Sequence, residues 1–208
     1  LLARTWRTQQ RALVKATSFV SEIAGSMLTT DDQAAALLVF TPALAYLCCI
    51  LGGPNSRVES RALAPARFAR LQARIGGAAL PSRPSSEGEW IAMSWLCEMT
   101  ALCEAAEQHE ARVRWFDFEA FLSSPATYLA DALRTLGVVP TVQDVEALLV
   151  SPWMGRYAKA PEHAYDAALR RSVLEVAQRE HRREIRRGME WLALAAGRHR
   201  LIDSALAH

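Results

Sequence analysis

Three short apolar segments, separated by long stretches of helical periodicity, constrain the fold of this chain most. They are residues 11–19, 35–41 and 112–118, and each closes with hydroxyl-bearing or acidic residues. Continuous apolar runs of this length are typical of strands that a parallel sheet buries on both faces. The second run also fits the start of a buried helix, since periodicity does not separate the two. The alternation of strand and long crossover predicts an α/β fold: a short parallel sheet flanked by helices, with more helix than strand.

Helical signals fill the sequence between and after these segments. Residues 86–109 carry apolar side chains at 3.6-residue spacing, which predicts an amphipathic helix. A second helix is predicted between Ser124-Pro125 and Gly137, and Thr141-x-x-Asp144 opens a third. A long charged helix is predicted from about residue 162 to residue 196.

The residues between 76 and 88 are rich in Gly, Pro and Ser, as in a linker. Neither flanking half has the features of an independent unit. We therefore expect residues 1–208 to form a single α/β domain, with this segment as an internal connection.

Composition and charge exclude several classes of protein. The 24 basic and 22 acidic residues leave a formal charge of +2, which does not favour a nucleic-acid or membrane-surface partner. No uncharged apolar run reaches the ~18 residues that a membrane span needs. The four cysteines have no C-x-x-C spacing, so we expect buried thiols in a reducing, cytoplasmic compartment and no metal site.

The end of the first apolar run is a candidate anion site. Lys15 offers a point charge, and the hydroxyls of Thr17 and Ser18 offer hydrogen bonds. The alternative is an ordinary surface lysine beside a helix cap. Lys15 and Lys159 are the only lysines in a chain that has 24 basic residues, and both stand in polar, loop-like contexts.

A second candidate lies ahead of the long charged helix. Gly155, Arg156 and Lys159 fall within five residues, and His163 follows. Arginine and lysine close to a helix N-terminus can clamp a phosphate or sulfate. The alternative is a surface connector of ordinary composition.

Two further groups carry weaker signals. The Gly-Gly-Pro-Asn-Ser-Arg segment that ends in Arg57 is a turn by composition, and it also offers an arginine to a phosphate. Asp117 and Glu119 follow the third apolar run; paired carboxylates can divide acid and base roles, but capping a helix or orienting a basic residue is the simpler interpretation. The sequence lacks the H-E-x-x-H, G-x-S-x-G and G-x-G-x-x-G motifs.

Taken together, these stretches resemble the P-loop sulfotransferases, in particular bacterial sulfotransferase-like proteins. Val14-Lys15-Ala16-Thr17-Ser18 is similar to the family's strand that ends in Lys-Thr-His. Leu38-Val39-Phe40-Thr41-Pro42 resembles its strand and Arg-Asp-Pro turn. Residues 115–137 resemble its Y-E-D-L-x-x-x-P…L-G segment, and residues 155–159 resemble the C-terminal loop that closes over the nucleotide.

The resemblance implies transfer of a sulfuryl group from 3′-phosphoadenosine 5′-phosphosulfate to a small-molecule acceptor. It assigns Lys15 to the transferring group, places Thr17 or Ser18 at the position of the family's catalytic histidine, and makes Gly155, Arg156 and Lys159 cosubstrate-binding residues. Arg57 is a further candidate for a phosphate.

This sequence departs from the family pattern at the 3′-phosphate site and near its start. Phe40 and Cys48, or Thr41 and Cys49 with a shift of one residue, stand where the family has its phosphate-binding Arg and Ser. No Gly-rich phosphate-binding loop precedes residue 11, and residue 1 is Leu. We therefore expect an incomplete P-loop sulfotransferase domain that is truncated at its N-terminus.

Two other functions fit the same residues. A binding or interaction module that keeps the fold without the chemistry would explain the missing Arg, Ser and His. A nucleotide kinase-like P-loop enzyme would prefer ATP to a 3′,5′-bisphosphate.

Overall fold

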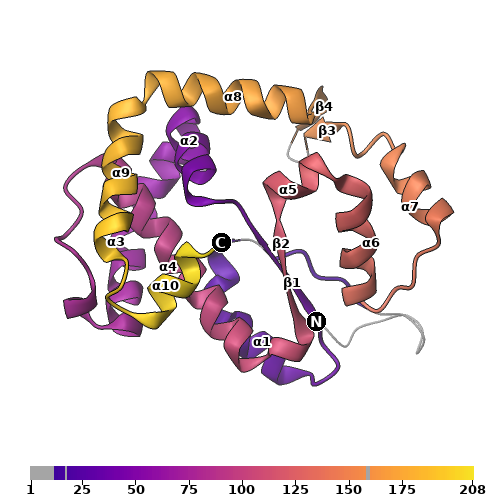
Figure 1. Cartoon of the computed structure of the whole chain (residues 1–208), viewed down its shortest axis with the longest axis horizontal. Helices are drawn as coiled ribbons and strands as arrows, with labels where there is room; N and C mark the ends of the chain where they lie inside the picture. The colour runs from indigo at the N-terminus through magenta and orange to yellow at the C-terminus, as the bar shows by residue number, and fades with distance from the viewer. Residues whose placement is uncertain (1–11, 17, 158–159) are drawn as a thin grey trace.

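A two-stranded parallel sheet lies between two groups of helices in the computed structural model, which describes residues 12–16, 18–157 and 160–208 (Figure 1). Strands β1 (Ala36–Phe40) and β2 (Val113–Asp117) run parallel, with Ala36 opposite Val113 and Phe40 opposite Asp117. The strands predicted over residues 35–41 and 112–118 are therefore confirmed, and so is a helix-rich α/β architecture.

The strand predicted over residues 11–19 is wrong. Residues 12–16 have no regular secondary structure and are all exposed, and Ser18 begins a 3-10 helix, η1 (Ser18–Ile23). An apolar run becomes a strand only where a neighbouring strand satisfies its backbone N–H and C=O groups. Here β1 and β2 pair with each other, and neither pairs with residues 12–16.

The other elements are helices and one short antiparallel hairpin. In chain order they are α1 (Ala24–Thr30), α2 (Ala43–Gly52), α3 (Pro54–Ile75), η2 (Gly77–Ala79), α4 (Glu87–Gln108), η3 (Glu110–Arg112), α5 (Phe118–Ser123), α6 (Pro125–Thr135), α7 (Val142–Leu149), β3 (Arg156–Tyr157), β4 (Ala160–Ala164), α8 (Ala167–Glu180), α9 (Arg182–Ala195) and α10 (Arg200–Leu206).

The single long helix predicted over residues 162–196 is also wrong. Its first residues belong to β4, and the rest is divided between α8 and α9 by a non-helical residue, His181, at φ −112° and ψ 21°. Asp166 caps α8 by accepting a hydrogen bond from the backbone N–H of Leu169 at 2.7 Å. Because both helices keep a 3.6-residue apolar spacing, the periodicity gave no sign of a one-residue break between them.

Helix α4 is the centre of the fold. Its N-cap is Ser86, which forms a reciprocal capping box with Glu89. The sequence predicts an apolar stripe on this helix, but every residue from 91 to 100 is buried. A helix that is buried on all sides is a core helix, and α3, α9 and α10 pack around it.

Two glycines allow α4 and α9 to cross at close range. A Cβ atom at Gly88 would lie 1.8 Å from the backbone oxygen of Glu184, and one at Gly188 would lie 2.6 Å from the backbone oxygen of Gly88. The Glu184 carboxylate also accepts a hydrogen bond from the Gly88 N–H at 2.9 Å. Any side chain at this crossing would therefore force the two helices apart.

The sheet separates a large helical group from a small one. Figure 1 shows α2, α3, α4, α9 and α10 on one side, α5, α6 and α7 on the other, and α8 spanning between them. One face of the sheet buries Leu38 and Phe40 toward the large group. On the other face Phe116 packs against Phe121 and Tyr128 of the small group, while Val39 is 57 % exposed.

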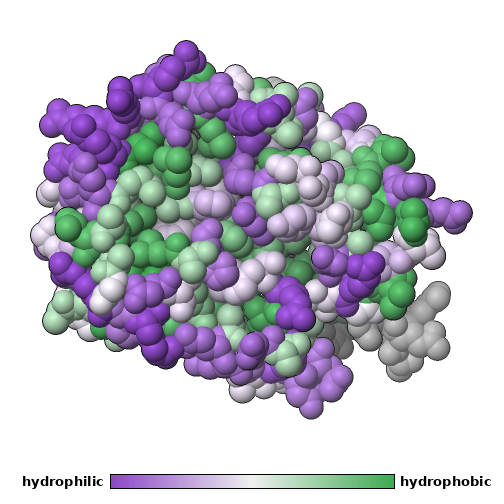
Figure 2. Space-filling view, viewed as in Figure 1, coloured by the Kyte–Doolittle hydropathy of each residue, from purple (hydrophilic) through white to green (hydrophobic). Residues whose placement is uncertain are grey.

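The small group buries little of its own surface. Helices α6 and α7 each contain a single buried residue, Ala132 and Val145. Apolar side chains gather on the surface at this end of the molecule (Figure 2), and the strongly exposed ones are Val139, Val142, Val150 and Trp153. In the part of the chain that the structure describes, none of the helices has both the length and the apolar composition to cross a bilayer.

Candidate functional site

The carboxyl ends of β1 and β2 form one edge of the sheet, which we call the carboxyl edge. Phe40 and Asp117 are the paired last residues of the two strands. Thr41-Pro42 then leads into α2, and the Asp117 carboxylate caps α5 by accepting from the backbone N–H groups of Glu119 at 2.8 Å and Ala120 at 3.2 Å. Ligands of parallel sheets bind outside the carboxyl ends of the strands, so this edge is the first place to seek a site.

A buried ion pair extends from the carboxyl edge to α8. The Arg170 guanidinium donates to the Glu119 carboxylate through Nη2 at 2.5 Å and through Nε at 3.1 Å. The Arg170 side chain is 12 % exposed, and its guanidinium carbon lies 5.6 Å from the Phe118 ring centre. Both carboxylates at this edge therefore have the simpler of their expected roles: Asp117 caps a helix and Glu119 orients a basic residue.

Two other polar side chains lie near Arg170 and interact with its charge: Cys49 of α2 and Tyr165, just before α8. Burial raises the pKa of the Cys49 thiol and of the Tyr165 phenol, and the nearby guanidinium opposes both shifts. Burial is the largest single influence on Arg170 and works against its charge, but the hydrogen bond to Glu119 and the electrostatic interactions with Cys49, Tyr165 and Glu119 together outweigh it and raise its pKa. The guanidinium is therefore always charged.

The candidate loop at Gly155 and Arg156 lies beside this ion pair. The carbonyl of Gly155 accepts a hydrogen bond from the backbone N–H of Tyr165 at 2.9 Å, which joins the start of the β3–β4 hairpin to the start of α8. Arg156 lies on β3 and is exposed. Lys159 lies outside the described residues. The structure thus places Gly155 next to the start of α8, and the role of this loop as a ligand clamp stays a prediction.

The candidate anion site of Lys15, Thr17 and Ser18, expected at the end of the first apolar run, does not stand at a strand end. Lys15 lies in the exposed segment 12–16 and forms no hydrogen bond or ion pair with another described residue. Ser18 is the first residue of η1, and Thr17 lies outside the described residues. Because the expected strand does not form, these residues do not follow a third strand end at the carboxyl edge.

The positions that correspond to the family's 3′-phosphate site are apolar and closed. Phe40 is 9 % exposed and packs edge-on against Trp115, with ring centres 5.7 Å apart. Cys48 is 1 % exposed, and burial raises the pKa of its thiol to about 11. Under the shifted alignment, the Thr41 carbonyl accepts a hydrogen bond from Trp95 Nε1 at 2.9 Å. None of these side chains supplies a cation for a phosphate.

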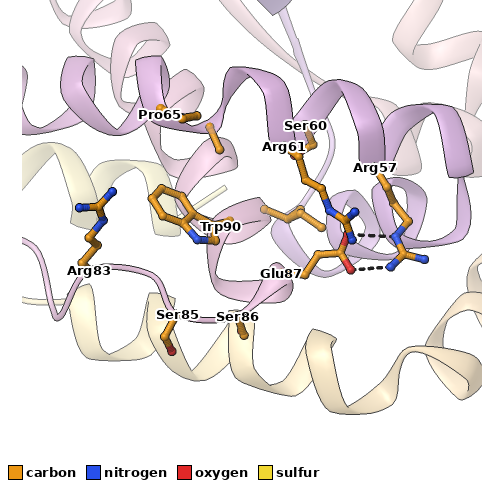
Figure 3. Close-up of a pocket in the computed structure, with 11 residues that line it drawn as sticks. Arg57, Ser60, Arg61, Pro65, Arg83, Ser85, Ser86, Glu87 and Trp90 are labelled. Atoms are coloured by element: carbon orange, nitrogen blue, oxygen red, sulfur yellow. Dashed lines mark hydrogen bonds and ion pairs between the residues drawn. The ribbon is translucent and has the colours of Figure 1, made fainter.

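Arg57 lies on a different part of the molecule, in a cavity of about 350 Å³ between α3 and the start of α4 (Figure 3). The composition of residues 52–57 predicted a turn, but this prediction is wrong for Arg57, which lies in α3 because that helix begins at Pro54. Its guanidinium is paired with Glu87 at 2.6 Å and 3.0 Å, and Arg61 contacts the same carboxylate at 2.9 Å. The hydrogen bond from Arg57 lowers the pKa of Glu87. We call this cavity the arginine groove; it is lined by Arg57, Ser60, Arg61, Ala64, Pro65, Arg83, Ser85, Ser86, Glu87, Trp90 and Ile91.

The cysteines follow the sequence expectation in part. Cys48, Cys97 and Cys103 are buried and Cys49 is half-buried, and none of the described cysteines forms a disulfide. Burial raises the pKa of the Cys103 thiol to about 12. Among the described residues, histidine, cysteine and carboxylate side chains nowhere gather in threes that could hold a metal ion.

The sequence did not single out Arg170, the residue at the centre of the site. Arg170 is one of several arginines on a charged helix, and the only indication of its role was the expectation that Glu119 orients a basic residue. Comparison of the chain with models of known protein families, with curated proteins and with solved structures gave no match.

Proposed function

We propose that this protein is sulfotransferase-like and binds 3′-phosphoadenosine 5′-phosphosulfate at the carboxyl edge. One observation carries the proposal. Two of the four stretches that resemble the family, the Thr41-Pro42 turn and the Asp117–Glu119 strand end, lie side by side at this edge. The third, which begins at Gly155, is joined to the residue before α8, the helix whose Arg170 pairs with Glu119. This arrangement is what supports the proposal.

Arg170 and Arg156 are the cations that the proposal assigns to the anionic groups of the cosubstrate. Arg170 is held by Glu119 in a fixed orientation, and a guanidinium can share its donors between a carboxylate and a phosphate or sulfate. In the reaction, the sulfur–oxygen bond to the donor phosphate breaks as a new bond forms to the acceptor oxygen. Adenosine 3′,5′-bisphosphate leaves, and the acceptor proton passes to solvent. Lys159 keeps the role that the resemblance gives it as part of the proposal, whereas Lys15 is given none, because the strand expected before it does not form.

Calorimetric titration with adenosine 3′,5′-bisphosphate tests the proposal. We expect saturable binding, with Arg170 and Arg156 as the cations that hold the phosphate groups. The variants Arg156→Gln and Lys159→Gln should each weaken binding about tenfold, as expected for loss of one charged hydrogen bond. The matched control is Arg134→Gln, which removes an arginine that is 59 % exposed on α6. Tighter binding of ATP would instead indicate a kinase-like enzyme.

A non-catalytic binding module is the second candidate function, and a separate observation favours it. The side chains at the expected 3′-phosphate position, Phe40 and Cys48, are part of the buried core. These side chains therefore serve the core of the fold and offer no polar group to a phosphate. If adenosine 3′,5′-bisphosphate does not bind while the protein unfolds cooperatively, this second function replaces the first.

A further inference from the structure

We propose that the arginine groove is a second ligand site, for a small flat molecule that carries an acidic group at each end. The groove is separate from the carboxyl edge and lies between α3 and the residues that lead into α4. Its volume of about 350 Å³ falls in the range of small-molecule sites, which starts at about 300 Å³.

The charges of the groove are not balanced within the groove. Glu87 is its single carboxylate, and it is shared by Arg57 and Arg61. Arg83 has no carboxylate partner among the described residues. Three guanidinium groups against one carboxylate leave a local excess of positive charge, which favours an anionic ligand.

Arg83 is held in the groove by aromatic rings. Its guanidinium carbon lies 5.8 Å from the Trp90 ring centre and 5.9 Å from that of Phe68, and the two rings are packed edge-on at 5.7 Å. An arginine over an aromatic face keeps its charge and its outward N–H donors. It is therefore oriented for an acidic group without being neutralised.

The two ends of the groove are cationic, and its middle is flat. In Figure 3, Arg83 lies at one end and Arg57 and Arg61 lie at the other, with Trp90 between them. Ala64, Pro65 and Ile91 add apolar surface to the lining. A planar ring placed along Trp90 would therefore carry one acidic group toward each cationic end.

Ser60 adds a polar side chain to the lining of the groove. Its hydroxyl can donate a hydrogen bond to an oxygen of a bound ligand. An acidic group bound at the Arg61 end would accept this hydrogen bond.

Calorimetry with naphthalene-2,6-dicarboxylate tests the proposal, because this probe is flat and carries one carboxylate at each end. We expect saturable binding that Arg83→Gln and Arg61→Gln each weaken at least tenfold, and no binding of the neutral analogue 2,6-bis(hydroxymethyl)naphthalene. Arg61 is 64 % exposed and Arg83 is exposed, so neither substitution disturbs the core. Arg186→Gln, which changes an arginine that is 70 % exposed on α9, is the control.

Several results would overturn the proposal. They are no binding of the dicarboxylate at millimolar concentration, equal binding by the Arg61, Arg83 and Arg186 variants, or equal binding of the neutral analogue. The outcome is independent of the proposed function, because adenosine 3′,5′-bisphosphate should bind the Arg61 and Arg83 variants as it binds the unmodified protein.

Discussion

Replacing Gly188 with alanine should destabilise the protein, although alanine is the better helix former. Gly188 lies inside α9, where a change from glycine to alanine alone would stabilise the helix by about 1 kcal/mol. The added Cβ, however, would lie 2.6 Å from the Gly88 backbone oxygen and 2.4 Å from Leu47 Cδ2. Both are far inside van der Waals contact, and the first neighbour is backbone that cannot rotate away.

Relief of this clash requires α9 to move away from α4, which carries the core. Overpacking of this kind costs about 1–3 kcal/mol, and the upper part of that range applies because the obstacle is a main-chain atom. After the gain in helix propensity, we expect a net loss of about 2 kcal/mol. For a chain of this size, that corresponds to a fall in melting temperature of roughly 4–8 °C.

Urea unfolding followed by circular dichroism measures the effect, and Gly25→Ala is the matched control. Gly25 is also helical, but a Cβ there would meet only the end of the Gln108 side chain, which can move aside. The control should change the free energy of unfolding by less than about 1 kcal/mol. If Gly188→Ala is as stable as the unmodified protein, with an unchanged m-value, the close crossing of α4 and α9 is refuted.

Three further predictions concern the ion pair in the core, the buried tyrosine and cysteine side chains, and the small helical group. Arg67→Met should cost about 3 kcal/mol, because it removes the guanidinium that pairs with the buried Glu98 at 2.7 Å and leaves the more distant Arg70, at 3.7 Å, as its remaining described partner. Adding Glu98→Leu should restore most of the loss, and a single variant as stable as the parent protein would contradict this. The free energy of unfolding should be steady between about pH 7 and pH 8 and fall toward pH 12. Burial raises the pKa of Tyr46 to about 12 and that of Cys48 to about 11, whereas the unfolded chain ionises these groups near their ordinary values and so loses its protons first. Urea titrations at several pH values measure this, and a flat profile above pH 9 would refute it. Hydrogen exchange should show the amides of α6 and α7 opening before those of α4, since each of the two outer helices buries one residue; equal protection would contradict this.

The sequence predicted the elements whose signals are local. The helix start predicted at Thr141-x-x-Asp144 is present as a capping box, because a side chain and the amide it caps lie three residues apart. The strands β1 and β2 were found because their apolar runs are bounded by a turn and by an acid. Residues 12–16 have the same composition and form no strand, since strand formation depends on a partner that no local pattern reveals.

The site was only partly predictable for the same reason. Glu119 could be expected to orient a basic residue, but its partner, Arg170, is 51 residues away and is one of several arginines on its helix. The arginine groove joins α3 to the residues before α4, about 30 positions apart, so its composition could not be read along the chain. Only the packing of the helices brings these groups together.

The most direct test of the proposed function is to map where adenosine 3′,5′-bisphosphate binds. Amide nitrogen–proton spectra recorded during a titration would report each backbone position. Binding at the carboxyl edge predicts progressive, saturable shifts for Thr41, Glu119, Tyr165 and Arg170, with the amides of the arginine groove unchanged. No shifts at millimolar nucleotide, or shifts confined to residues away from this edge, would contradict the account.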